Sequence, residues 1–416
     1  MSIEFNTREK LRAVIGQIDR LLLSDFPHTA SEEALKRLKK FFEGQANRLK
    51  RAIATNHIPT IVGACSTANE RIYDYLPILG FLLRSTNVRN SFEAYYSLLS
   101  LARALLGNDA EFILSSEWDY SPLTYPMNVS LLPKFVLLGL PSSESPNALI
   151  LPLAGHELGH SVWQNEQLEN HYATTIEKKA QKYMKSNWKS FQDAFPEHQE
   201  LSVLSDDELI DNMFLAQIIS EISSLSLCQI EECFCDGIGL TIFGSSYFYA
   251  FHYFLAPNFG GYRSPDYPPL SVRARYMAKY GEIDTKYIGF KNFEKEFHEE
   301  TFKSGSREKY ILNAADNVTN NVARTIYRRA QTIAKKKAAD YTPNPDAQAH
   351  ILRMFENGIP SEAEGSISDI VNAGWNFVRQ NRDTWKDADR PIVEWVSELI
   401  LKSIEVLEYQ NEAMQC

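Results

Sequence analysis

The residues with the clearest chemical potential are two histidines and a glutamate in the segment His156-Glu157-Leu158-Gly159-His160. Histidines at positions i and i+4 lie one turn apart on one face of a helix, so both imidazoles can bind the same metal ion. The glutamate next to the first histidine can reach a water molecule on that ion. We therefore expect a hydrolytic zinc site. The simpler alternative, two histidines packed in a core helix, requires buried partners for both imidazoles and for the carboxylate.

A catalytic zinc ion needs a third protein ligand and an open position for water. In the metzincin arrangement, a third histidine would fall at position 166 and a glycine at position 163, but these positions hold Glu166 and Trp163. The metzincin subclass is therefore disfavoured. The better candidates for the third ligand lie downstream, in the acidic segment from residue 231 to residue 237, EECFCDG.

Two carboxylates of this segment, Glu232 and Asp236, are separated by one helical turn. If Glu232 binds the metal, Asp236 on the same face can accept the distal N–H of a ligating histidine, which we expect to be His156. Glu231 lies about 100° around the helix axis from Glu232 and has no such partner one turn away. We prefer Glu232 to Glu231 as the third ligand. The neighbouring Cys233 and Cys235 are interpreted as small buried residues, with metal binding as the alternative.

In these residues the chain resembles the gluzincin zinc peptidases, in which HExxH supplies two ligands and a downstream helix supplies glutamate in an ExxxD pattern. Within them it is similar to soluble relatives of the HtpX and CAAX prenyl endopeptidase group. The resemblance rests on HELGH, on Glu232 and Asp236, and on the segment YPPLSVR at residues 267–273, which is similar to an HPPLxxR element. It covers about residues 134–280. Tyr267 replaces the histidine of that element. We do not expect this chain to act on the membrane or prenylated substrates of the group.

The resemblance implies a zinc-dependent peptidase that acts on a protein or peptide substrate. In such enzymes a metal-activated water attacks the peptide carbonyl, and Glu157 would be the general base that takes its proton. Arg273 and Tyr267 are the first candidates to stabilise the oxyanion, with Tyr249 and His252 as further ones. The alternative is a catalytically silent zincin-like module that binds zinc and serves as an interaction or regulatory surface. A hydrolase for another substrate is a third possibility.

The elements that must position these residues are mainly helical. Apolar residues recur at helical spacing from residue 7 to residue 106, and short strand-like runs follow near residues 111–122 and 134–141. We expect a mainly α (α+β) chain with a helical segment at 1–110, a zincin-like metallopeptidase core with a small sheet at 111–290 and a helical segment at 291–416. The run at 135–140 is interpreted as a sheet edge along which an extended substrate lies.

The composition excludes several classes of function. The 416 residues include 43 Lys and Arg against 53 Asp and Glu, a net charge of -10, which argues against a phosphate-backbone binder, so no nucleic acid is expected. The basic run at 324–337 is interpreted as a solvated helix face. The N-terminal segment lacks the uninterrupted apolar stretch of a secretory signal, because charged residues interrupt it. The five cysteines are not spaced as in a disulfide framework. We expect a cytoplasmic protein.

One apolar segment, residues 237–257, is close to the length that spans a bilayer. Its Gly, Ser, Thr, His and Tyr residues make it less apolar than a typical membrane span, and it directly follows the acidic segment. We therefore expect a buried helix here and no stable membrane insertion.

Overall fold

The structure is a computed structural model that describes residues 3–85, 92–117, 123–125, 131–141, 144, 146–198, 211–256, 263–281, 297, 305–362, 365–385 and 390–413. It is mainly helical, as the sequence predicts, with one small sheet. The chain forms two compact units. The first contains Met1–Arg103 and Gly107–Pro146, and the second contains Ala104–Leu106 and Asn147–Cys416.

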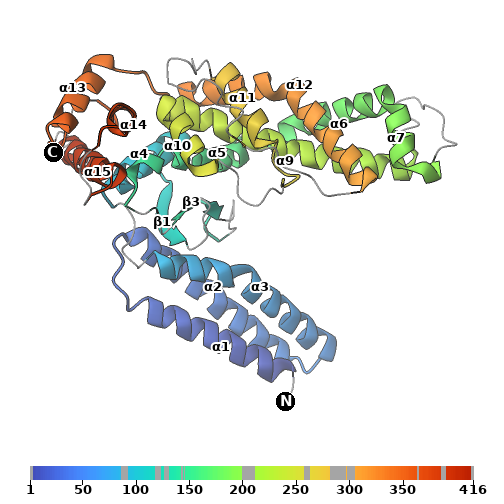
Figure 1. Ribbon diagram of the computed structural model, residues 1–416. Helices are drawn as coiled ribbons and strands as arrows, with labels where there is room; N and C mark the ends of the chain where they lie inside the picture. The colour runs from blue at the N-terminus through green and yellow to red at the C-terminus, as the bar shows by residue number, and fades with distance from the viewer. Residues whose placement is uncertain are drawn as a thin grey trace. The chain divides into compact units, whose positions relative to one another are not determined.

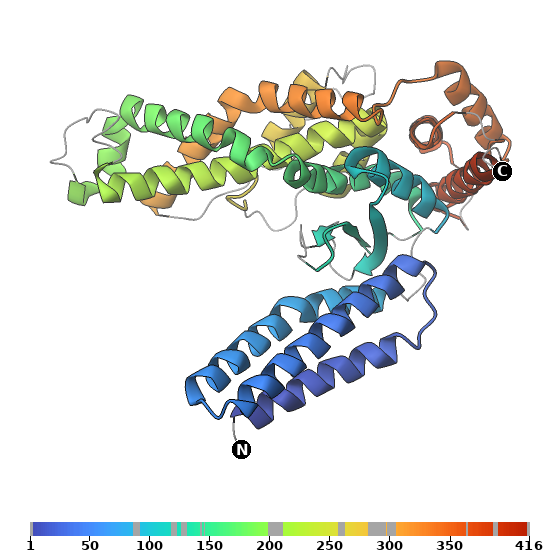
Figure 2. The ribbon, with the colours of Figure 1, turned by 180° about the vertical axis from the view of Figure 1, so that it is seen from behind.

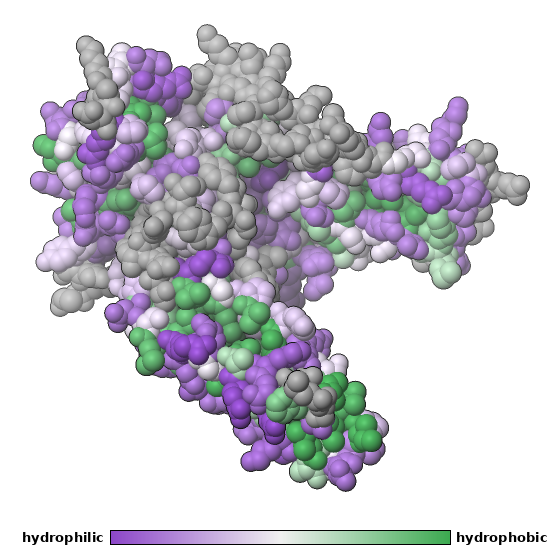
Figure 3. All heavy atoms as spheres, turned by 60° about the horizontal axis from the view of Figure 1, so that its bottom comes forward, coloured by the Kyte–Doolittle hydropathy of each residue, from purple (hydrophilic) through white to green (hydrophobic). Residues whose placement is uncertain are grey.

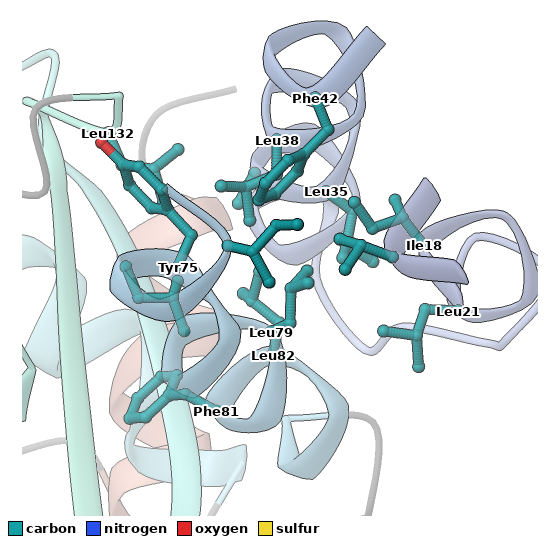
Figure 4. Close-up of a cluster of buried hydrophobic side chains, with 14 of the residues drawn as sticks. Ile18, Leu21, Leu35, Leu38, Phe42, Tyr75, Leu79, Phe81, Leu82 and Leu132 are labelled. Atoms are coloured by element: carbon teal, nitrogen blue, oxygen red, sulfur yellow. The ribbon is translucent and has the colours of Figure 1, made fainter. Parts of the chain in front are cut away.

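Three helices lie side by side in the first unit: α1 (Ile3–Leu21), α2 (Thr29–Ala54) and α3 (Ile58–Arg84) (Figures 1 and 2). Leu35, Leu38 and Phe42 recur at helical spacing on α2 and are fully buried, because they form one apolar face with charged residues between them. Figure 4 shows these side chains facing Ile18 and Leu79, from the neighbouring helices. Apolar contact between three helices therefore holds this part together.

Some apolar side chains of these helices remain exposed. Ile58, Tyr73 and Leu76 on α3 are exposed, as is Ile3 at the start of α1. Figure 3 shows hydrophobic patches on this part of the surface. The short helix η1 (Phe92–Ala94) and α4 (Tyr95–Leu106) follow, and α4 runs from the first unit into the second.

The sheet has three strands, β1 (Glu111–Glu117), β2 (Leu123–Tyr125) and β3 (Phe135–Pro141), in the order β1-β3-β2. β3 pairs in parallel with β1 along its whole length, and residues 137–139 of β3 pair antiparallel with β2. The expectation that residues 135–140 form a sheet edge is therefore wrong. The short strand β2 covers the side of β3 that a substrate would have used.

The second unit is built around the long helix α9 (Met213–Phe243). Around it pack α5 (Leu153–Asn165), α6 (Leu168–Ser186) and α12 (Ser306–Lys336), with α10 (Ser245–Leu255) and α11 (Leu270–Tyr280) at its C-terminal half. The remaining elements are η3 (Ala148–Ile150), α7 (Trp188–Ala194), η4 (Pro196–His198), α13 (Pro345–Glu356), α14 (Ile367–Asn381) and α15 (Ile392–Ala413).

The two compact units do not divide at residue 110 or 290, where the sequence analysis placed its boundaries. β1 packs on α2 and α3 and pairs with β3, which keeps residues 111–141 with the N-terminal helices. At the other end, α12 packs along α9, so residues after 290 belong with the HExxH helix. The small sheet and that helix therefore belong to different compact units.

The apolar segment at residues 237–257 is broken into two helices. α9 ends at Phe243 and α10 begins at Ser245, because Gly244 takes a positive φ of 60° that other residues rarely adopt. Most described residues of the segment are buried, as expected. Among the described helices, α9 alone has the length and hydropathy of a membrane span, a test that core helices of water-soluble proteins also pass.

Candidate metal centre

Two glycines bring α5 into backbone contact with α9. A Cβ atom on Gly159 would lie 2.7 Å from the Cα atom of Cys235, and one on Gly155 would lie 3.0 Å from the Cα atom of Gly239. No larger residue fits at either position without moving a helix. Since residue 155 meets residue 239 and residue 159 meets residue 235, the two helices run antiparallel. Their close approach carries the histidines of α5 to the carboxylates of α9.

The inner nitrogens of both histidines face one carboxylate. The Nε2 atom of His156 lies 3.3 Å from Oε2 of Glu232, and the Nε2 atom of His160 lies 3.6 Å from Oε1 of the same residue. The two imidazole rings are 5.1 Å apart and nearly perpendicular. Glu232 Oε2 is buried and has no hydrogen-bond donor among the described residues. The structure thus brings together the three residues expected to bind the metal, with an ionisable oxygen that lacks a hydrogen bond.

The outer nitrogens of the same histidines are held by two further carboxylates. His156 donates from Nδ1 to Oδ1 of Asp236 over 3.1 Å, which is the pairing that the spacing of Glu232 and Asp236 predicts. His160 donates from Nδ1 to Oε1 of Glu231 over 2.8 Å. Glu231, which the spacing argument set aside as a third ligand, thus holds the outer nitrogen of His160. Such bonds orient an imidazole and leave its other nitrogen free to bind a metal.

Asp236 is the centre of a fully buried polar network. Its Oδ2 accepts a hydrogen bond of 2.9 Å from Nε of Arg273, and its Oδ1 accepts one of 2.7 Å from Nη2. The hydroxyl of Tyr247 also donates to Oδ1, over 2.7 Å, and lies 3.2 Å from Nδ1 of His156. Arg273, which the sequence suggests as an oxyanion stabiliser, is hydrogen-bonded to the aspartate behind His156, and its Nη2 atom lies 3.4 Å from Oε2 of Glu232. Sequence reasoning missed Tyr247, which no spacing rule connects to Asp236.

Tyr267 lies at the more open side of the site. Its ring lies 5.6 Å from the guanidinium carbon of Arg273, and 42% of its surface is exposed. The charge of Glu232, together with burial and the charge of Glu157, raises the pKa of Tyr267 above its ordinary value. The phenol therefore keeps its proton at neutral pH and can donate a hydrogen bond. Glu157 itself is buried.

The other two aromatic candidates contact different residues. Tyr249 on α10 stacks on Trp375, and the guanidinium carbon of Arg379 lies over the Tyr249 ring, 5.1 Å from its centre. His252 on the same helix lies edge-on to Phe297. None of these contacts involves His156 or His160.

The charges of the site favour a cation between the histidines and Glu232. Burial lowers the pKa of His156, but the neighbouring carboxylates of Asp236 and Glu232 outweigh burial and raise it to about 10. Burial raises the pKa of Glu232, but His156 and Arg273 outweigh it and lower the pKa below its ordinary value. The carboxylates therefore stay ionised at neutral pH and attract positive charge, as a proton on His156 or as a metal ion.

A second possible third ligand lies nearby. The ligand atoms of His156, His160 and Cys235 are all within 4.8 Å of one another, a grouping that could hold a metal ion. Cys235 is buried, and burial followed by the charge of Glu231 raises the pKa of its thiol well above the ordinary value. A thiolate is the form that binds metal, so Cys235 must lose a proton first, whereas Glu232 is already ionised. The donor set is two imidazoles with a carboxylate or a thiolate.

No family model, curated protein or solved structure matches this chain. The functional argument therefore depends on the geometry of the chain itself.

Proposed function

We propose that the protein is a zinc-dependent peptidase of the zincin type, with His156, His160 and Glu232 as the metal ligands. One observation carries the proposal: both Nε2 atoms face the carboxylate of Glu232, while a carboxylate holds each Nδ1. Two histidines and one carboxylate are the donor set of a catalytic zinc site that keeps a position for water. The two outer carboxylates fix the histidine tautomers that this set requires.

The residues around this donor set have different roles in the proposed reaction. A bound zinc ion supplies Lewis-acid polarisation and makes a nearby water a stronger acid. Glu157, beside His156 on the same helix, takes a proton from the attacking water and passes it to the leaving amine nitrogen. The protonated phenol of Tyr267 donates to the oxygen that gains negative charge. Arg273 positions Asp236, and through it His156, and its Nη2 atom also lies 3.4 Å from Oε2 of Glu232.

The first test is the metal content of the purified full chain, measured by mass spectrometry after zinc is supplied. We expect about one zinc per chain in the wild type, loss of zinc in Glu232→Ala, and retention in Cys235→Ser. In Glu231→Ala, zinc should bind about 10–100-fold more weakly, because His160 loses the partner of its outer nitrogen. A wild type that binds no zinc would contradict the proposal, and loss of zinc in Cys235→Ser alone would assign the third ligand to the thiolate.

The second test separates an enzyme from a silent zinc-binding module. Zinc-loaded wild type is incubated with fluorescein-labelled casein and with a peptide library prepared from a proteome, and cleavage products are identified by mass spectrometry. Glu157→Gln should keep its zinc and lose about 10²–10⁴-fold in turnover. If the zinc-loaded wild type cleaves neither probe, the zinc-binding interaction module is the better description.

A further inference from the structure

An exposed stripe of α9 leads along the helix to the metal centre. Met213, Gln217, Glu221, Ser224 and Cys228 follow one another at spacings of three or four residues and are all exposed. Residues with this spacing share one face of a helix. Three residues after Cys228, the same face reaches Glu231, the partner of His160. A chain lying along this stripe would approach the metal ligands directly.

A cavity of about 390 Å³ opens on this stripe between α9 and α12. Its walls include four apolar side chains that come from α9, from α12 and from the segment before Tyr267: Leu225, Ile311, Leu312 and Pro265. The remaining lining residues are small or acidic: Ser220, Ser224, Glu221 and Glu308. The cavity is thus an apolar hollow with a polar mouth, which is the usual character of a binding site for an organic side chain.

The surroundings of the cavity are negatively charged. Glu221 and Glu308 line it, and among the described residues the neutral amide of Gln217 donates to Oε1 of Glu221 over 3.2 Å, while no Lys or Arg pairs with either carboxylate. Farther along α9, Cys228 is an exposed residue whose thiol is partly buried, and this burial, followed by the charges of Asp266 and Glu231, raises its pKa to about 11. None of the described lining residues is Lys or Arg. The combination of apolar walls and uncompensated carboxylates is complementary to an apolar side chain with a cationic neighbour.

The length of the stripe sets the distance between cavity and metal. Leu225 and Glu221 precede Glu232 by 7 and 11 residues, which is about 10 Å and 16 Å along a helix. An extended peptide covers about 3.3–3.6 Å per residue. A side chain in the cavity would therefore belong to a residue about three to five positions from a peptide bond held at the metal.

We propose that this cavity is a substrate subsite, which binds a bulky apolar side chain next to a Lys or Arg, three to five residues from the cleaved bond. This inference rests on the proposed peptidase function and adds a substrate class to it. The subsite selects a polypeptide that is extended over α9, with Pro265 and Tyr267 on one segment joining the cavity to the reacting bond.

Binding tests the subsite without relying on turnover. The zinc-loaded full-length Glu157→Gln variant is titrated into a fluorescein-labelled peptide with one phenylalanine beside two lysines in an otherwise Ala, Gly and Ser sequence. Two matched peptides carry Gly in place of the phenylalanine or Glu in place of the lysines. Fluorescence anisotropy should show about 10–100-fold tighter binding of the first peptide, the range expected for one apolar side chain in a fitting pocket.

Ser224→Trp, added to this variant, fills the cavity from an exposed position of α9. It should remove the preference for phenylalanine over glycine and leave the zinc content unchanged. Ser190→Trp is the matched control, since Ser190 on α7 is exposed and does not line the cavity. Glu221→Lys with Glu308→Lys should remove the preference for lysine over glutamate, and added salt should reduce that preference in the parent protein.

Two kinds of failure are distinguishable. Equal binding of the phenylalanine and glycine peptides, or a preference that Ser224→Trp does not change, overturns the subsite even if the wild type cleaves the peptide library. Selective binding together with no cleavage by the zinc-loaded wild type supports the subsite and overturns the peptidase function.

Discussion

The helices α1–α3 and the α5–α9 centre both contain fully buried side chains, but those side chains differ in chemistry. Leu38 and Phe42 of α2 are fully buried in an apolar cluster, and Asp236 of α9 is just as fully buried. Burial of an apolar side chain stabilises a fold, whereas burial of a charge is unfavourable unless partners and hydrogen bonds compensate. The α5–α9 region concentrates four carboxylates around two histidines and one arginine. A fold would not need this arrangement for stability, which is why it indicates function.

The largest effect should come from breaking the buried charge network. Arg273→Met removes both guanidinium bonds to Asp236 and leaves that carboxylate buried with one cation fewer. We expect a loss of about 3–5 kcal/mol in the unfolding free energy of zinc-free protein, the usual cost of removing one partner of a buried ion pair. Denaturant unfolding of the full chain measures the loss. Arg275→Met, two residues away and exposed, should change stability by less than about 0.5 kcal/mol.

An equal loss of unfolding free energy in Arg275→Met would contradict the assignment of this stabilisation to the buried network around Asp236.

A comparable but chemically silent effect is expected in the apolar cluster. Leu38→Ala removes a fully buried side chain that Figure 4 shows among the packed residues of α1–α3. The unfolding free energy of this part should fall by about 2–5 kcal/mol through lost transfer energy and a residual cavity. Zinc content, measured on folded protein, should remain unchanged. Leu23→Ala, at a position that is 87% exposed, is the control and should be close to neutral. Loss of zinc in folded Leu38→Ala would contradict this separation of roles.

Substitution of one glycine in each region should give smaller effects of opposite sign. A methyl group on Gly159 would meet the backbone of α9 at Cys235, so Gly159→Ala should push the two helices apart. We expect a destabilisation of about 1–3 kcal/mol and weaker zinc binding, because the imidazoles move away from Glu232. Gly44 on α2 has no atom within 4 Å of its would-be Cβ. Gly44→Ala should therefore stabilise α2 by up to about 1 kcal/mol. Calorimetric unfolding and zinc titration of both variants check the contrast.

Local spacing predicted which residues of the candidate site meet but not how the faces of the helices pair. The i, i+4 relations within HELGH and between Glu232 and Asp236 follow from one helix at a time, and these residues do meet in the structure. The roles of Glu231 and Tyr247 depend on how α5 and α10 sit against α9. That arrangement is set by close contacts at Gly155, Gly159 and Gly239, which no periodicity reveals.

The fold shows the same division between local and long-range information. Apolar periodicity predicted the helices of both compact units and the strands β1 and β3. It did not predict β2, whose three residues make β3 the central strand. The unit boundary at Pro146 was also missed, because it depends on β1 packing against α2 and α3.

The smallest expected effect concerns a buried carboxylate whose hydrogen-bond donors among the described residues are all neutral. Asp369 at the start of α14 accepts hydrogen bonds from the backbone and hydroxyl of Ser366, and from the hydroxyl of Tyr341 over 2.7 Å. Burial raises its pKa, but these donors outweigh burial and lower the pKa below the ordinary 3.8. Unlike Asp236, it has neutral donors in place of a histidine and an arginine. We therefore expect Asp369 to stabilise a helix start and to bind no metal.

The direction of the pKa shift predicts how this contribution depends on pH. Because the folded-state pKa lies below the unfolded value, the stabilisation is complete above the unfolded pKa and is lost as the pH falls through the folded one. Asp369→Asn should cost about 1 kcal/mol at neutral pH, the usual value of a helix cap, and the difference from wild type should shrink below about pH 4. Denaturant unfolding at a series of pH values measures it, with the exposed Asp346→Asn at the start of α13 as control. A difference that grows on acidification would mean that the carboxylate is held in its protonated form, and the comparison with Asp236 would then have to be redrawn.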